Sequence, residues 1–141
     1  MVKNGGFEAL EKLSAEAKKY IAPLPIDYEP DEEAAGMFGL MMMTSGKHTD
    51  PENVAKAQAL KDATMGWFIA QNLKSKFVHL NGNYHSDFKK GIITYLNKYR
   101  PGLKIATVCS VRQDDIKKLG EENEGRADFY ICVPTDMTMT Y

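Results

Sequence analysis

The sequence predicts an α/β fold in which a small, mostly parallel sheet and the helices packed on it form three layers. Three apolar runs, at residues 77–81, 104–111 and 128–133, have the composition of strands, and the last two are rich in β-branched residues. A helical pattern over residues 86–99 separates the first two runs, as in a βαβ unit with parallel strands and a right-handed crossover. A long helical pattern over residues 50–73 precedes all three runs.

Size and composition favour one compact domain. A chain of 141 residues with 43% hydrophobic content can bury a real core, but it is short for two ordinary domains. We expect a single α/β domain with a helical part at residues 1–73 and a βαβαβ part at residues 76–134. The net charge of -1, from 18 basic and 19 acidic residues, gives no electrostatic footprint for nucleic acid. No apolar run reaches the roughly 20 residues of a membrane span, so the chain is expected to be soluble.

The first third of the chain predicts two helices joined by a proline-rich connector. Apolar residues recur at helical spacing over residues 7–21, and Pro23 and Pro25 end this pattern. Residues 22–30 contain three prolines and should form an extended connector of fixed shape. Acidic residues then open a second helix with its body at residues 34–43.

The long helix has a well-marked beginning. After a polar loop over residues 44–50, Asp50 can serve as the N-cap and Pro51 can occupy the first helical position. Glu52 places an acid in the first turn, where the helix dipole favours negative charge. We expect this helix to continue to about Leu73.

One face of the long helix mixes polar and apolar side chains. Gln58, Asp62 and Met65 share this face with Ile69, because they are spaced four, three and four residues apart. A second stripe consists only of small residues, which would let another backbone or a flat ligand come close: Ala59, Ala63, Gly66 and Ala70. Ordinary helix-on-sheet packing with Asp62 at the rim is the competing interpretation.

The most informative stretch is the turn after the first strand-like run. Gly82, Asn83, Tyr84 and His85 follow that run directly, and a helical pattern begins at Ser86. We therefore expect His85 at the carboxyl end of a parallel strand, where open α/β sheets hold their ligands. Glycine lets a backbone turn tightly and lets a partner approach, while an imidazole can bind a metal, shuttle a proton or accept a hydrogen bond.

The last connection and the cysteines carry less information. A short helix over residues 114–119 and a charged loop over residues 120–126 should join the second and third strands. Cys109 and Cys132 fall in strand-like runs without the C-x-x-C spacing of a metal knuckle. Buried free thiols are the expected state, and the redox state of the two cysteines stays open.

Three landmarks stand in order along the chain: the helix segment AQALKDATM at residues 57–65, the turn GNYH at residues 82–85 and the pair Gly91 and Ile92. Together they resemble the ChaN family of iron-regulated, haem-binding lipoproteins in the Tiki superfamily. In that family an AQ-x-x-[RK]-D-x-x-MA helix precedes a strand ending in a G-x-x-H turn, followed by a glycine-isoleucine pair. Residues 20–26 also resemble the family's segment leading into this half, so the resemblance covers nearly the whole chain.

The chain departs from the family pattern at several positions. Gly66 stands where the family carries alanine, and the window between His85 and Gly91 retains Phe88 as its only aromatic residue. The family suggests a tyrosine as the iron ligand, and Tyr84 is the nearest phenol. The superfamily's earlier G-x-x-H or glutamate motif is not found here. We therefore expect the chain to be a fragment, the carboxyl-terminal half of a larger EreA/ChaN-like fold.

The resemblance implies a protein that binds haem, or a related flat tetrapyrrole, and that serves iron or haem uptake. Tyr84 and His85 are the implied metal ligands, with His79 as a further donor. The other implied contacts are Gly82, Asn83, Gln58, Asp62, Met65 and Phe88. Met37, Met41 and Met42 could line a macrocycle edge, and Lys47, Lys89 and Lys90 could reach its carboxylates.

The resemblance and the chain's small size also imply a setting and an assembly. A homodimer is expected, because a half-domain of this size cannot enclose a porphyrin alone. The expected location is the cell envelope, on the periplasmic side or as an outer-membrane lipoprotein. The lipid anchor that would attach it to the membrane is not present in this chain.

Two other classes of function stay open. A metal-dependent hydrolase, similar to the proteases or esterases of the superfamily, would use His85 as ligand or base with Asp62 and Asp87 as carboxylates. A zinc site needs three or four protein ligands, however, and only one histidine is well placed for it. A purely structural or assembly role is the remaining possibility.

Overall fold

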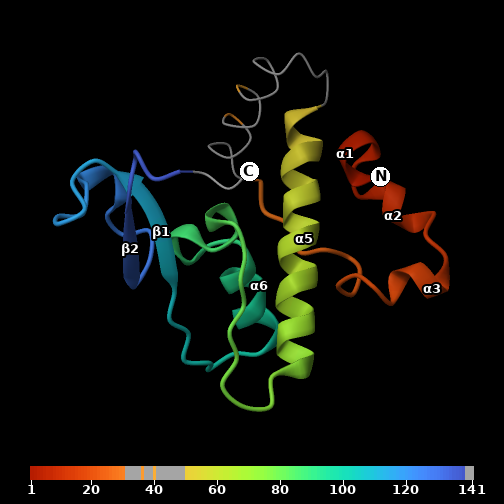
Figure 1. Ribbon diagram of the computed structural model, residues 1–141. Coiled ribbons are helices and arrows are strands. Elements are labelled where there is room, and N and C mark those ends of the chain that lie inside the picture. The colour runs from red at the N-terminus through yellow and green to blue at the C-terminus, as the bar shows by residue number, and fades with distance from the viewer. Residues whose placement is uncertain (31–35, 37–39, 41–49, 139–141) are drawn as a thin grey trace. The chain divides into compact units, whose positions relative to one another are not determined.

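The computed structural model describes residues 1–30, 36, 40 and 50–138, and it divides into two units, residues 1–72 and 73–141. We describe each unit by itself (Figure 1). Helices together with a small parallel sheet confirm the predicted α/β class. None of the described helices combines the length and the apolar composition needed to span a bilayer. Several predictions fall outside the described residues: most of the helix at 34–43, Met37, Met41, Met42 and Lys47.

The long helix of the first unit, α5, spans Pro51–Asn72 and confirms the prediction closely. A carboxylate oxygen of Asp50 accepts a hydrogen bond of 2.9 Å from the backbone N–H of Glu52, which satisfies one of the free donors at the helix start. The Glu52 carboxylate also lies 2.8 Å from the Lys56 ammonium, one turn further along. The sequence signals for the helix start therefore act as expected.

The single helix predicted over residues 7–21 is wrong. Two short helices stand there instead, α2 at Glu8–Glu11 and α3 at Ala15–Lys18, and a third, α1 at Val2–Gly5, precedes them. Gly6 adopts a positive φ of 60° and ends α1. Ser14 is extended, and its hydroxyl accepts a hydrogen bond of 3.1 Å from the Ala17 N–H. Local capping therefore divides the segment, and of its apolar residues Leu10 is buried while Tyr20 is exposed.

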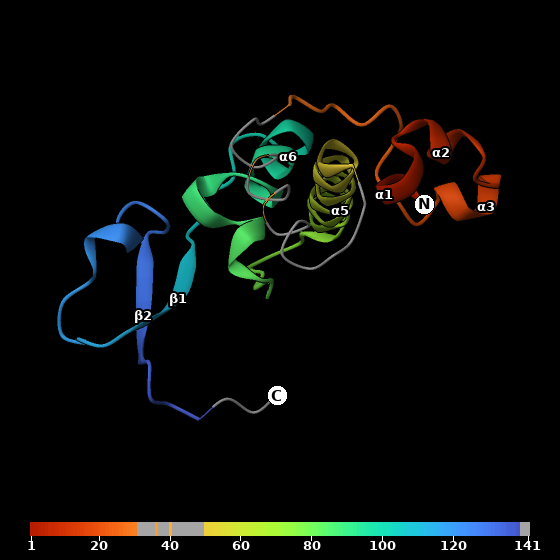
Figure 2. The same cartoon turned by 90° about the horizontal axis from the view of Figure 1, so that it is seen from above.

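The amino-terminal segments pack along α5. Figure 2 views α5 nearly end-on, with α1 beside it. The backbone N–H of Ala22 donates a hydrogen bond of 3.2 Å to the Thr64 hydroxyl, next to the fully buried Ala63. The connector that follows α3 therefore contacts α5 at Thr64. Phe7 meets Tyr28 edge-to-face at 5.6 Å, and Tyr28 packs on the buried cluster of Val54 and Ala55.

The sheet of the second unit contains β1, Val108–Gln113, and β2, Phe129–Pro134. The two strands are parallel and in register from the pair Val108 and Phe129, as predicted for the second and third runs. Burial alternates along β1, so that Cys109, Val111 and Gln113 face inward.

The boundary between the two units also lies where the long helix ends. The first unit ends at Asn72, close to the predicted end of that helix.

The predicted first strand, residues 77–81, is wrong in the described part of the chain. This segment is extended but unpaired, and the sheet has two strands. Phe77, Val78 and Leu80 are 50%, 83% and 88% exposed. Its composition favours a strand, but a strand needs a neighbouring backbone to satisfy its N–H and C=O groups. The predicted first βαβ unit is therefore incomplete here.

The helix predicted over residues 86–99 forms only in its second half, as α6, Ile92–Tyr99. Two short 3₁₀ helices precede it, η1 at Asn83–His85 and η2 at Asp87–Lys89. Gly91 caps α6 at φ 55° and ψ -120°, a conformation that only glycine adopts without strain. Ile92, Ile93, Tyr95 and Leu96 form the buried face of α6.

The helix predicted over residues 114–119 is also wrong. A turn stands there, followed by the 3₁₀ helix η3 at Glu121–Asn123. The buried amide of Gln113 replaces the internal bonds of a helix: its nitrogen donates to the carbonyls of Asp115 and Lys118, and its oxygen accepts from the Gly120 N–H. A side chain that binds the loop backbone in this way competes with helix formation.

Candidate functional site

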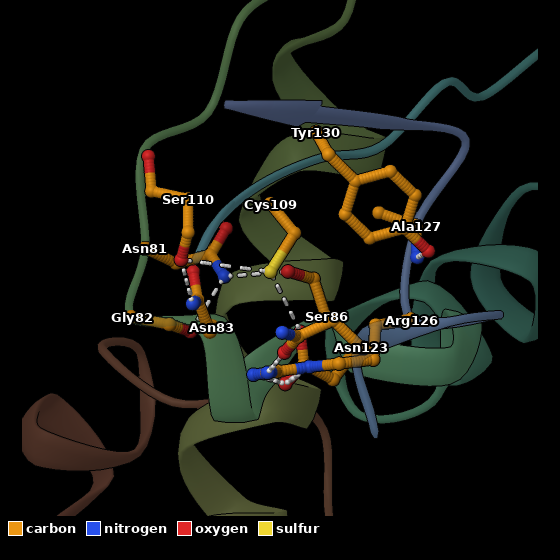
Figure 3. Close-up of polar contacts among 11 residues, drawn as sticks. Asn81, Gly82, Asn83, Ser86, Cys109, Ser110, Asn123, Arg126, Ala127 and Tyr130 are labelled. Atoms are coloured by element: carbon orange, nitrogen blue, oxygen red, sulfur yellow. Dashed lines mark hydrogen bonds and ion pairs between the residues drawn. The ribbon is translucent and has the colours of Figure 1, made fainter. Parts of the chain in front are cut away.

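The GNYH turn is a tight and internally bonded structure. The His85 N–H donates a hydrogen bond of 2.9 Å to the Gly82 carbonyl, which defines the first 3₁₀ turn. The Asn81 side-chain amide donates to the Gly82 carbonyl at 2.9 Å and to the Ser86 hydroxyl at 3.0 Å (Figure 3). These bonds hold Tyr84 and His85 in one short turn, as the sequence predicts, although the segment before it is not a strand.

The turn is also bonded to the sheet. The side-chain amide of Asn83 donates a hydrogen bond of 2.7 Å to the Ser110 carbonyl in β1 (Figure 3). The bond joins residues 27 positions apart in the chain. A side chain, rather than a strand ladder, therefore fixes the turn beside β1.

Gly82 is not needed for the backbone conformation of this turn. Its φ of -67° and ψ of 142° lie in the extended region that any residue adopts, so the predicted steric reason for glycine is wrong. No atom lies within 4 Å of the position that a Cβ would take. The space beside the backbone is therefore open, which leaves room for a partner.

Two side chains at the turn can donate to a metal. The Tyr84 phenol is 39% exposed, and its ring meets the half-buried His85 ring edge-to-face at 5.4 Å. Desolvation, and after it the nearby His85, lower the pKa of His79, which keeps that imidazole neutral and able to bind a metal at neutral pH. This donor set fits haem, because the porphyrin supplies four nitrogens and the protein needs to add only one or two axial donors.

The residues after the turn present an aromatic side chain. Phe88 is 55% exposed and has a positive φ of 56°, and Lys89 follows with a φ of 57°. The Lys89 ammonium lies 2.7 Å from an Asp128 carboxylate oxygen. The predicted role of Lys89 as a partner for haem carboxylates therefore competes with an ion pair within the protein.

Asp128 joins this segment to the sheet. Its pKa is lowered to about 2 by Lys89 first and then by the N–H and hydroxyl of Thr107, which donate at 2.8 Å and 3.0 Å. Asp128 is therefore ionised throughout the neutral range. Sequence reasoning did not single out Asp128 or Thr107.

A second polar cluster was also missed. The Asp87 carboxylate accepts hydrogen bonds from Arg126 through Nη2 at 2.6 Å and Nε at 3.1 Å. Arg126 Nη1 donates to the Asn123 side chain at 2.7 Å, and the Cys109 thiol lies 3.6 Å from Asp87 (Figure 3). Asp87 and Arg126 are 39 residues apart, so no local spacing could have paired them.

The helix residues of the predicted site lie on α5, in the first unit. Asp62 is buried at 4% exposure, so the competing interpretation that places it at the rim is wrong. Gln58 and Met65 are half-buried, and the Gln58 amide oxygen accepts a hydrogen bond of 3.1 Å from Lys61. The haem contacts that the resemblance implies for these three residues stay predictions.

A multi-ligand metal centre finds no support in the residues that the structure describes. Among them, no three histidine, cysteine, aspartate or glutamate side chains gather closely enough to hold a metal ion. Asp87, which the hydrolase hypothesis would use, is paired with Arg126. The described geometry therefore offers one or two axial donors at the turn rather than a zinc site.

Comparison with known proteins adds one finding. A family model described as "Haem-binding uptake, Tiki superfamily, ChaN" matches residues 1–96. The matched region contains all of α5 and the GNYH turn, and it ends within α6. Separate searches of curated proteins and of solved structures found no significant match.

Proposed function

Since the chain belongs to the ChaN family of haem-binding uptake proteins in the Tiki superfamily, we propose that it binds haem at residues 82–88 and serves haem or iron uptake. The observation that carries the proposal is the pairing of Tyr84 with His85 in a turn that is open to solvent on one side. Phenolate and imidazole are both established axial ligands of haem iron.

In this proposal Tyr84 is the axial ligand and His85 orients its ring. The edge-to-face contact at 5.4 Å restrains both rings, and the bond from Asn83 to Ser110 restrains the backbone between them. Phe88, more than half exposed, offers an apolar face to the plane of the ligand. Bound haem would supply the redox-active iron, while these side chains would bind and orient it.

A homodimer and a cell-envelope location are further parts of the proposal. Exposed turn residues cover only one side of a flat ligand, and a second copy of the chain could cover the other side. Size-exclusion chromatography with and without hemin tests this part. A monomer under both conditions would refute the dimer. The envelope location follows from the family resemblance, and fractionation of the native cells tests it.

A hemin titration followed at the Soret band tests the main proposal. The parent protein should shift the band and saturate at a fixed ratio of hemin to chain. Tyr84→Phe keeps the ring but removes the iron-binding oxygen, and it should weaken binding by about tenfold or more, which corresponds to about 1.4 kcal/mol. His85→Ala should weaken binding less, because it removes an orienting contact.

Tyr20→Phe is the matched control. Tyr20 is 69% exposed and lies in the first unit, so this variant loses the same atom at another exposed tyrosine. Hemin affinity should stay at the parent value. A parent protein that leaves the Soret band unchanged would refute haem binding, and equal losses in Tyr20→Phe and Tyr84→Phe would refute the assignment of Tyr84.

A further inference from the structure

The segment that follows the turn has a strained backbone. Phe88 and Lys89 adopt positive φ angles of 56° and 57°, a region that is unfavourable for any residue other than glycine. Two consecutive residues of this kind persist only where other contacts impose the conformation. The contacts that impose it here come from residues 126–128.

Two bonds to that distant segment hold the strained pair. The Phe88 N–H donates a hydrogen bond of 2.8 Å to the Arg126 carbonyl, and the Lys89 ammonium pairs with Asp128 at 2.7 Å. The first bond uses the backbone of Arg126, so it fixes where the chain turns after Asp87. The ion pair between Lys89 and Asp128 holds the second residue of the strained pair against the same distant segment.

The guanidinium of Arg126 binds the residue just before the strained pair. It reaches one oxygen of Asp87 through two nitrogens, and both side chains are largely shielded, at 24% and 16% exposure. Charge-assisted bonds of this geometry are directional and stronger than neutral ones. A third nitrogen binds the Asn123 side chain, so the guanidinium is itself held in place. Arg126 therefore binds Asp87 through its guanidinium and Phe88 through its backbone carbonyl.

We propose that Arg126 is a positioning residue for the haem site, which orients Tyr84, His85 and Phe88 by fixing the chain at Asp87 and Phe88. The inference rests on the proposed function, and it adds a residue that lies beyond the matched region, residues 1–96. Arg126 acts through the backbone of the turn and touches no ligand.

A merely structural ion pair predicts something different. If Arg126 only stabilised the second unit, its loss would lower stability but leave the ligand environment of a folded protein unchanged. If Arg126 positions the turn, its loss changes how the turn presents the phenol. The spectrum of the bound haem and the hemin affinity therefore distinguish the two roles.

Three variants test the proposal in the full chain. Arg126→Ala should weaken hemin binding by about tenfold and change the Soret band and the electron paramagnetic resonance signal of the ferric protein. Arg126→Lys keeps one charged donor and should recover part of the affinity. Arg112→Ala is the matched control, because it removes an arginine that binds the carbonyls of Thr135 and Met137, and it should match the parent.

A measurement without haem keeps this test separate from that of the proposed function. Hydrogen exchange of the backbone amides of His85 and Phe88, followed by NMR in the ligand-free protein, should be faster in Arg126→Ala and unchanged in Arg112→Ala. If the parent binds no hemin, the proposed function fails, and amide exchange still reports whether Arg126 fixes the turn.

Two results would overturn the positioning role. The first is parent-like hemin affinity and spectra in a folded Arg126→Ala variant, even if its stability is lower. The second is parent-like amide exchange at His85 and Phe88 in that variant. Should Arg126→Ala fail to fold, Arg126→Lys and Asp87→Asn carry the same comparison, since both weaken the contact without removing a whole side chain.

Discussion

Thr107 and Asp128 bind each other through three hydrogen bonds at the start of the two strands. The Thr107 N–H and hydroxyl donate to one Asp128 oxygen, and the Asp128 N–H donates back to the Thr107 hydroxyl at 3.1 Å. The next residue, Phe129, then donates its N–H to the Thr107 carbonyl at 3.0 Å. This reciprocal pair fixes the register from which the parallel ladder continues.

The second unit should lose stability in acid because of Asp128. Its pKa is lowered from 3.8 to about 2 in the folded protein, so its carboxylate contributes stability above about pH 4. That contribution is lost as the pH falls toward 2. Asp128→Asn removes the titration, so the difference in unfolding free energy between parent and variant should be greater at pH 5.5 than at pH 2.5.

Urea unfolding followed by far-UV circular dichroism measures this difference. Fluorescence of Trp67, the only tryptophan, follows the first unit and serves as the internal control. Its transition should respond equally to pH in both proteins. A parent-to-variant difference that stays constant from pH 5.5 to pH 2.5 would show that Asp128 is not the titrating group.

Gly91 should be intolerant of substitution. It caps α6 at φ 55° and ψ -120°, and a side chain there is strained whatever the space around it. Gly91→Ala should therefore lower the free energy of unfolding of the second unit by about 1–3 kcal/mol. Thermal unfolding followed by circular dichroism measures the change, and a variant as stable as the parent would contradict the assigned conformation.

The two cysteines should differ in reactivity. Cys109 is 2% exposed, and burial first, then the neighbouring Asp87, raise the pKa of its thiol, while Cys132 is half-buried. Because the thiolate is the reactive form, Cys109 should react slowly in the folded protein. A colorimetric thiol assay should find one fast group in the native state and two in denaturant. Cys132→Ser should abolish the fast reaction, and its persistence would contradict the burial of Cys109.

The fold was predictable where local signals agree with each other. Asp50 and Pro51 mark the start of α5, and the β-branched runs predict both strands. Predictions failed where a single side chain or a missing partner decides the structure. Ser14 divides the first predicted helix, Gln113 binds the loop backbone, and residues 77–81 lack a neighbouring strand.

The part of the candidate site that depends on local sequence was also predictable. The GNYH turn is a local feature, so the spacing brings Tyr84 and His85 together, and the edge-to-face contact bears this out. Its supports come from far along the chain. Ser110 and Arg126 contact the turn region from 27 and 39 residues away, and only the folded backbone reveals such pairs.

The last prediction concerns the open side of Gly82. Its backbone lies in a region that alanine adopts freely, and no atom stands within 4 Å of the added Cβ. Gly82→Ala should therefore leave the stability of the ligand-free protein within about 0.5 kcal/mol of the parent. If haem lies against this face of the turn, the methyl group will hold the ring away and weaken hemin binding by about tenfold.

Paired thermal unfolding and hemin titration of Gly82→Ala measure both quantities. Ser75→Ala is the matched control, because Ser75 is exposed. Gly125→Ala would not serve, because Gly125 has a positive φ of 75° and alanine there would be strained. Ser75→Ala should leave stability and affinity unchanged. A Gly82→Ala protein that is as stable as the parent and binds hemin equally well would place the ligand away from this face, because a methyl group in the contact plane cannot be accommodated without loss of packing.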